Sequence, residues 1–235
     1  MNIFSTTSRI FLLTSFLMSL TGCVSKNLTS NNRPSFFFQM ADTQFGMFTN
    51  DSGFVKETIN FETAISAANR LHPAFVVVCG DLVNQLTNSG EITEYKRIAD
   101  QLDPSIPLYN VAGNHDVGRT QPTPEGLANY RKHFGADYYT FRSGNIYGIV
   151  LNSSLFYDPS LVPEEAAKLD VWLRSTLKKA SKIKNVNIVV FQHISWFLKD
   201  SNEKNGYFNI PSERRKTYLD LFHQYGVKYI FAGHL

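Results

Sequence analysis

Residues 75–84 read FVVVCGDLVN, and they show the architecture of this chain more plainly than any other segment. The first four residues are apolar and mostly β-branched, which indicates a strand buried on both faces. Cys79 ends the apolar run and is expected to be a small buried hydrophobic residue. Gly80 and Asp81 follow at once, so an acidic side chain is expected where the strand ends. In open sheets covered by helices, functional groups gather beyond the carboxyl ends of the strands.

Similar apolar runs recur along the chain and alternate with helical patterns. They predict further strands at residues 36–40, 108–111, 138–141, 146–151, 186–191 and 227–231. Apolar residues at helical spacing predict helices around residues 61–71, 163–177 and 211–225. This alternation predicts an α/β or layered sandwich fold. A chain of 235 residues is long enough for one large domain, which we expect over residues 35–235.

The composition is that of a globular protein with little net charge. Apolar residues make up 43% of the chain, and the formal net charge is +3. This charge is too weak to indicate a nucleic-acid partner, so no nucleic-acid binding is expected. Two short basic clusters, Lys178-Lys179 and Arg214-Arg215-Lys216, fall in predicted helices. We expect both clusters to be solvated helix faces.

The first 22 residues have the pattern of an export signal. Arg9 is the only charged residue before an apolar run that is too short to span a bilayer. The run ends in Leu20-Thr21-Gly22-Cys23, which resembles the lipobox of bacterial lipoproteins. Lipidation of Cys23, a flexible tether over residues 23–34 and a lipid-anchored location in the bacterial cell envelope are therefore expected. The alternative is an ordinary secretory signal that leaves Cys23 as a spare thiol.

Polar residues with metal-binding chemistry follow five of the predicted strands. The five motifs are Asp42-Thr43-Gln44, Gly80-Asp81-Leu82-Val83-Asn84, Gly113-Asn114-His115-Asp116, Gln192-His193 and Gly233-His234. Each motif alone is weak, since a Gly-Asp pair is usually a turn. Together they supply carboxylate oxygens, an amide oxygen and imidazoles, a mixture that suits divalent or trivalent first-row metals.

These motifs resemble the calcineurin-like metallophosphoesterase superfamily, whose pattern is D-x-H, G-D-x-x-D/N, G-N-H-D/E, H and G-H-x-H. Segments 41–46, 79–84, 151–153 and 191–194 are most similar to one branch, the calcineurin-like phosphoesterase domain-containing protein 1 group. The resemblance implies a four-layer α/β/β/α sandwich and an enzyme that hydrolyses phosphoric esters. It also implies two metal ions, which would be manganese, iron, zinc or magnesium.

The resemblance also implies a role for each motif residue. Asp42 and Gln44 are expected to bind the first metal, and Asp81 is expected to bridge both metals. The second metal is expected to be bound by Asn114, His193 and His234. His115 is the expected catalytic imidazole and Asp116 its orienting carboxylate, whereas Asn84 is expected to support its loop.

These roles describe a hydrolytic mechanism with clear chemistry. Two metals can clamp a phosphoryl group and lower the pKa of a shared water, so that a bridging hydroxide attacks phosphorus. His115 would then act as general acid toward the departing alkoxide, and Asp116 would accept a hydrogen bond from its ring. We expect hydrolysis of phosphate monoesters, either small esters or phosphoprotein. The alternatives are a phosphodiesterase or nucleotidase, and a non-catalytic binding lipoprotein with the same fold.

Two departures from the superfamily pattern bear on the first metal. Gln44 stands where most of the superfamily has histidine, although the named branch shares the glutamine. The sequence stops at Leu235, before the second histidine of G-H-x-H, so a C-terminally truncated domain is expected. The remaining histidines, His72, His133 and His223, are expected to be structural or at the surface. Asn152 could serve either a pocket or a structural turn.

Overall fold

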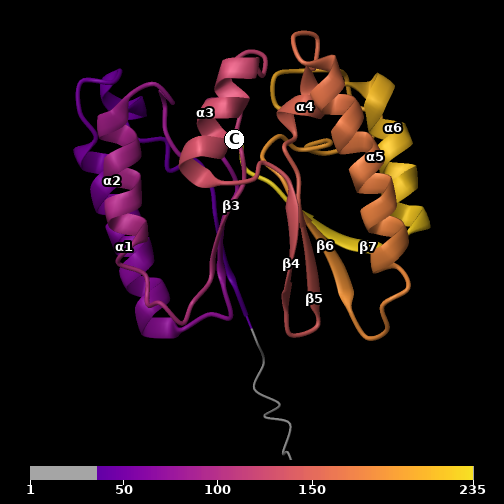
Figure 1. Ribbon diagram of the computed structural model, residues 1–235, viewed down its shortest axis with the longest axis horizontal. Coiled ribbons are helices and arrows are strands. Elements are labelled where there is room, and N and C mark those ends of the chain that lie inside the picture. The colour runs from indigo at the N-terminus through magenta and orange to yellow at the C-terminus, as the bar shows by residue number, and fades with distance from the viewer. Residues whose placement is uncertain (1–35, 235) are drawn as a thin grey trace, which may run out of the picture. The chain divides into compact units, whose positions relative to one another are not determined.

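The computed structural model describes residues 36–234, and within them two β-sheets face each other (Figure 1). The first sheet is entirely parallel, in the order β1-β2-β3. The second sheet has the order β4-β5-β6-β7, and only the β4–β5 pair is antiparallel. The strand bounds are β1 Phe38–Met40, β2 Val76–Val78, β3 Leu108–Asn110, β4 Tyr139–Ser143, β5 Ile146–Val150, β6 Asn187–Phe191 and β7 Val227–Phe231.

Helices cover the outer face of each sheet, which gives the layer order α/β/β/α (Figure 1). On the first sheet lie α1 (Val55–Leu71) and α2 (Ser89–Ala99), and on the second sheet lie α5 (Pro163–Ala180) and α6 (Ser212–Gln224). The short helices η1 (Met47–Thr49) and α4 (Ser154–Tyr157) and the helix α3 (Pro124–Phe134) belong to the connections that follow strands. The predicted four-layer sandwich is therefore confirmed.

Strand β2 shows why the layers form. Val77 faces the second sheet, in a buried cluster that also holds Cys79, Phe141 and Phe191. Val76 and Val78 face the other way and pack in the cluster that holds the apolar side of α1. Both faces of the strand are thus buried, as the continuous apolar run predicts. Cys79 is fully buried, so its prediction as a small hydrophobic residue is also confirmed.

All seven predicted strands and the three predicted helices are present, with ends that differ by up to a few residues. One prediction about the surface is wrong. Arg215, expected on a solvated face of α6, is 1% exposed, and its guanidinium donates to the carbonyl oxygens of Ile210, Ser201 and Glu203. Lys216 beside it is exposed, as predicted.

The predicted export signal and Cys23 lie outside the described residues. Among residues 36–234, none of the helices has the length and apolar character needed to cross a membrane.

Candidate metal centre

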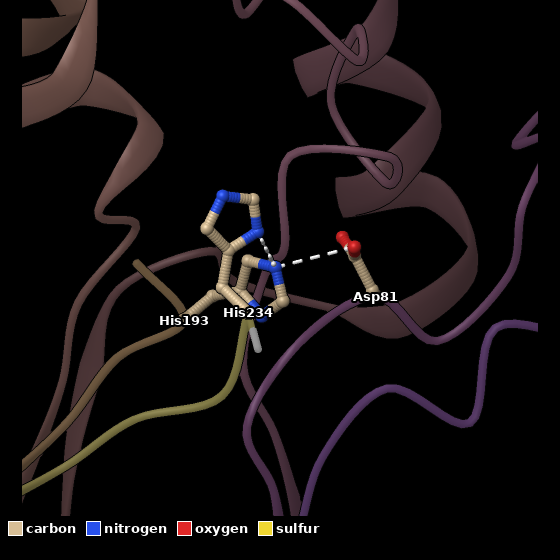
Figure 2. Close-up of side chains that lie close together, drawn as sticks. All are labelled: Asp81, His193 and His234. Carbon is tan, nitrogen blue, oxygen red and sulfur yellow. Dashed lines mark hydrogen bonds and ion pairs between the residues drawn. The ribbon is translucent and has the colours of Figure 1, made fainter. Parts of the chain in front are cut away.

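Four side chains from both sheets meet in a buried cluster beyond the strand ends. Asp81 follows β2 and Asn114 follows β3, whereas His193 follows β6 and His234 follows β7. The Nε2 atom of His193 lies at the centre of this group. It is 3.2 Å from Asp81 Oδ2, 3.0 Å from Asn114 Oδ1 and 3.1 Å from His234 Nδ1. Figure 2 shows Asp81 and the two histidines pointing toward one another.

Backbone carbonyls fix the orientation of three of these side chains. His193 Nδ1 donates to the Cys79 oxygen at 2.8 Å, and His234 Nε2 donates to the Tyr207 oxygen at 3.0 Å. Asn114 Nδ2 donates to the Arg119 oxygen at 3.0 Å. A carbonyl can only accept, so each of these contacts uses one proton. In the neutral imidazoles, which are the metal-binding form, the ring nitrogen that faces the cluster then carries a lone pair, as the amide oxygen of Asn114 does.

The facing atoms are therefore two imidazole nitrogens, a carboxylate oxygen and an amide oxygen, which are all electron-pair donors. The other three atoms lie 3.0–3.2 Å from His193 Nε2, so the cluster needs positive charge, either a proton on that nitrogen or a metal ion in its place. Nitrogen and oxygen donors of these types suit first-row transition metals. The residues present thus fit a metal ion.

The pKa values of the cluster also indicate a need for positive charge. Burial lowers the pKa of His193, but the carboxylates of Asp81 and Asp42 outweigh it and raise the pKa to about 9. Burial raises the pKa of Asp81, but the imidazoles of His193 and His115 outweigh it, so this pKa lies below its ordinary value. Burial and the neighbouring His193 lower the pKa of His234. The acidic groups thus favour a cation beside them.

Asp42 and Gln44 lie at the edge of this cluster. The carboxylate of Asp42 accepts a hydrogen bond from the backbone nitrogen of His234, at 3.1 Å from Oδ2 and 3.3 Å from Oδ1. Burial raises the pKa of Asp42, and the nearby Asp81 adds to the effect. The backbone nitrogen of Gln44 donates to the Asp81 oxygen, but its side chain makes no hydrogen bond to any described residue. Both residues are therefore beside the four-residue cluster rather than within it.

The backbone around the cluster is strained and closely packed. Asp42, Gln44, Asp81 and His234 all have positive φ angles, from 35° to 66°, a region that costs energy for residues other than glycine. Two glycines allow the close approach. A Cβ atom on Gly113 would lie 2.0 Å from the Asp81 nitrogen, and one on Gly80 would lie 2.6 Å from the His193 ring. These contacts explain the glycine in each motif.

His115 borders the cluster, but its ring is not oriented as expected. Its Nδ1 atom lies 3.2 Å from the Asn84 carbonyl oxygen, and its backbone nitrogen donates to Asp81 Oδ1 at 2.9 Å. The prediction that Asp116 accepts a hydrogen bond from this ring is wrong. The Asp116 carboxylate is fully buried and accepts from the backbone nitrogens of Leu82, Val83 and Gly113. Asp116 therefore ties the two motif loops together, because three backbone donors face it there.

Some residues of the site carry no sequence signal for their roles. The oxygens of Arg119 and Tyr207 orient ligand side chains, and any residue type can supply a backbone carbonyl. Ser153 Oγ accepts from the backbone nitrogens of His193 and Ile194. Asn152, for which a pocket or a structural role was expected, is fully buried. Its Nδ2 donates to Asp137 and its Oδ1 accepts from the backbone nitrogen of Ser154, so its role is structural. Ser153 is the exception, because it lies in the segment Leu151-Asn152-Ser153 that resembles the family branch.

The three other histidines lie apart from the cluster. His72 Nε2 is 3.2 Å from Ser105 Oγ in an exposed contact, and His223 is exposed on α6. His133 is partly exposed on α3 beside the ring of Phe134. The expectation that they are structural or surface residues is confirmed.

A pocket of about 230 Å³ opens beside the cluster. One wall is formed by Asn114, His115 and His234, so a bound molecule there contacts the ligand side chains and the free side of the His115 ring.

Comparison with known proteins identifies the family to which this chain is similar. Residues 37–235 match the family described as Calcineurin-like phosphoesterase. The serine/threonine-protein phosphatase CPPED1 of Bos taurus is 38% identical over 216 residues, which cover 86% of this chain and 69% of that protein. The CPPED1 of Homo sapiens is 36% identical over 217 residues, with the same coverage of each chain.

Solved structures share the fold at lower sequence identity. A dimetal phosphatase from Danio rerio superposes with a TM-score of 0.62 at 14% identity, over 86% of this chain and 82% of that chain. The purple acid phosphatase PPD1 from yellow lupin superposes with a TM-score of 0.57 at 15% identity, over 86% of this chain and 38% of that chain.

Proposed function

The chain belongs to the calcineurin-like phosphoesterase family, and we propose that it hydrolyses phosphate monoesters with His115 as the general acid. The family assignment makes it a hydrolase of phosphoester bonds that uses a dinuclear metal centre. One observation carries the proposal. The potential ligand atoms of Asp81, Asn114 and His234 all lie 3.0–3.2 Å from His193 Nε2, and His115 lines the pocket beside them.

The chain's own residues divide the work of the reaction. Asp81, Asn114, His193 and His234 would hold one metal ion, and Asp42 and Gln44 would hold the other together with Asp81. When bound, the metals polarise the phosphoryl group and lower the pKa of water. The buried position of the cluster excludes bulk water and strengthens every charge interaction within it.

His115 is suited to proton transfer because only one of its nitrogens is in use. Nδ1 donates to the Asn84 carbonyl, so Nε2 is left for the substrate side of the ring. In hydrolysis, the oxygen of water forms a bond to phosphorus and the bond from phosphorus to the alcohol oxygen breaks. Because the neutral ring uses its one proton on Nδ1, the acid is the imidazolium form, in which Nε2 carries a second proton. The departing alcohol oxygen takes that proton and leaves the neutral imidazole.

The test is an activity assay of the purified protein loaded with Mn²⁺, with phenyl phosphate as the monoester and methyl phenyl phosphate as the diester. We expect turnover that favours the monoester and disappears with a chelator. The variant His115→Ala should lower kcat by about 10²–10⁴-fold with unchanged metal content, because it removes only the proton donor. His223→Ala, which changes an exposed histidine of α6, is the matched control. Unchanged turnover in His115→Ala would remove the general-acid role, and no turnover of either ester by the metal-loaded protein would overturn the proposal.

A further inference from the structure

The pocket beside the metal centre is also lined by residues that the proposed hydrolysis does not use. These residues include Arg119, Tyr157 and Tyr207. The pocket volume of about 230 Å³ is below the roughly 300–1,000 Å³ typical of pockets for drug-sized ligands. A ligand of this pocket must therefore be compact.

Arg119 is held at the pocket by the backbone of a candidate metal ligand. The backbone nitrogen of Arg119 donates to the backbone oxygen of Asn114 at 2.6 Å, and the backbone oxygen of Arg119 accepts from Asn114 Nδ2 at 3.0 Å. The residue has a φ angle of 67°, which a side chain other than glycine seldom adopts. A movement of the Arg119 backbone would therefore break hydrogen bonds to Asn114.

The guanidinium of Arg119 is available for a ligand. In the described part of the chain it makes no hydrogen bond or ion pair, and Arg119 is exposed, as Arg70 and Arg142 also are. Arg119 is also the one arginine or lysine among the residues described as lining this pocket. A planar guanidinium binds phosphate oxygens well, often through two hydrogen bonds.

The two tyrosines give the pocket flat apolar walls. The ring centroid of Tyr207 lies 4.6 Å from that of His234, and its backbone oxygen holds His234 Nε2. Tyr157 is partly buried, and its backbone oxygen accepts from Arg214 Nη1 at 3.2 Å. The backbones of both residues are thus anchored beside the pocket, and their rings offer aromatic surface that favours a flat partner.

We propose that this pocket selects monoesters of compact flat alcohols, of the aryl phosphate class, with the Arg119 guanidinium binding the dianionic phosphate. The inference rests on the proposed phosphoesterase function and adds its substrate class. A monoester of this class carries two negative charges and a diester carries one, so Arg119 favours the monoester. The tyrosine rings lie beside the leaving alcohol and favour a planar group over a flexible chain.

The experiment measures kcat/KM of the metal-loaded protein for phenyl phosphate, butyl phosphate and methyl phenyl phosphate. Arg119→Gln should lower kcat/KM for phenyl phosphate by about 10–100-fold, the range of a lost hydrogen bond to a charged group. The same variant should lower it for the diester by less than about threefold. Tyr157→Leu should lower it several-fold for phenyl phosphate and little for butyl phosphate. Arg142→Gln, which changes an exposed arginine on β4 outside this pocket, is the matched control.

The outcomes separate this inference from the function on which it rests. If the unmodified protein hydrolyses none of the three esters, the proposed function fails. If it hydrolyses phenyl phosphate and Arg119→Gln affects monoester and diester equally, the phosphatase function stands and the role of Arg119 is overturned. A phosphoseryl peptide cleaved with a higher kcat/KM than phenyl phosphate would overturn the substrate class.

Discussion

Glu91 is a buried carboxylate that supports the loop of Asn84 and Gln85, next to His115. Its Oε2 atom accepts from the backbone nitrogens of Asn84 at 3.1 Å and Gln85 at 2.8 Å. The Asn84 carbonyl in turn orients the ring of His115. Asp51 lies beside Glu91 and accepts from the side chains of Asn84 and Gln85. Both carboxyl groups therefore contact the loop of Asn84 and Gln85, and the repulsion between two negative charges there favours a proton on one of them.

The stability of the protein should depend on the protonation of Glu91. Burial raises its pKa to about 7 from an ordinary 4.5, and the charge of Asp51 adds to the rise. The folded state therefore binds a proton more tightly than the unfolded state, so stability falls as the pH rises from about 4.5 through about 7. Glu91→Gln mimics the protonated carboxyl and should flatten this dependence. Urea unfolding at pH 5 and pH 8, at fixed metal concentration, measures it.

The comparison between the two pH values gives a clear result. The variant should match the unmodified protein at pH 5 and exceed it in stability at pH 8. Glu164→Gln, at an exposed position in the first turn of α5, is the matched control. A variant that is less stable at both pH values by the same amount would show that Glu91 is ionised throughout.

At the scale of residues, sequence could predict ligand types but not their orientation. The motifs named Asp81, Asn114, His193 and His234, and the structure brings these four together. The motif also suggested a role for Asp116 at the His115 ring, yet the ring contacts a backbone carbonyl. A backbone oxygen has no residue type, so no sequence pattern could indicate that contact. The roles of Arg119 and Glu91 also lacked a sequence signal, because these roles depend on tertiary neighbours.

Helix α6 uses a buried arginine to hold the segment that precedes it. Arg215 donates to the oxygens of Ser201, Glu203 and Ile210, so it fixes both ends of the segment that carries Tyr207. Tyr207 then holds His234 through its backbone oxygen. The helix is thereby connected to the metal centre through one side chain.

Arg215→Lys should destabilise the protein and weaken its metal binding. Lysine keeps the charge but lacks the planar fork that reaches three carbonyls at once. Unsatisfied buried carbonyls should lower the free energy of unfolding by about 2–3 kcal/mol. The freed Tyr207 segment should also raise the Kd for Mn²⁺. Urea unfolding and metal titration measure the two effects, with Lys216→Gln as the exposed control. Unchanged metal affinity in a destabilised variant would mean that the segment holds His234 without Arg215.

At the scale of elements, strands were easier to predict than two of the helices. The strands are runs of β-branched and aromatic residues, and their burial on two faces leaves little ambiguity. Helices α2 and α3 were not among the three predicted helices because each has few buried apolar residues, and one of the buried positions of α2 is Glu91. In α2 the hydrogen bond from Gly90 to the Asn88 side chain caps the start, a local signal that is weak alone. Helices are clearest in sequence where their apolar side is long, as in α5.

At the scale of the whole domain, the metal centre connects the two sheets. Asp81 extends from the first sheet, and His193 and His234 extend from the second (Figure 2). Asn114 follows β3 of the first sheet. Below them the sheets are joined by apolar packing, in which Phe75 and Phe141 have ring centroids 5.1 Å apart. The layered fold followed from the apolar pattern, whereas this meeting of two sheets at one point depends on strand order and register. A sequence without a family resemblance would not have indicated it.

A metal ion bound across the sheets should stabilise the folded domain. Unfolding separates the four ligands, so the unfolded chain binds the ion weakly and the folded state gains about 2.7 kcal/mol at 100 times the Kd. For a domain of this size the gain corresponds to a rise in Tm of roughly 5–10 °C. Thermal unfolding with Mn²⁺ and with a chelator measures it, independently of activity. His193→Ala removes the central ligand and should abolish the rise, whereas His223→Ala should retain it. An equal rise in His193→Ala would locate the stabilising ion away from this cluster, because His193 Nε2 is the atom within 3.0–3.2 Å of the other three ligand atoms.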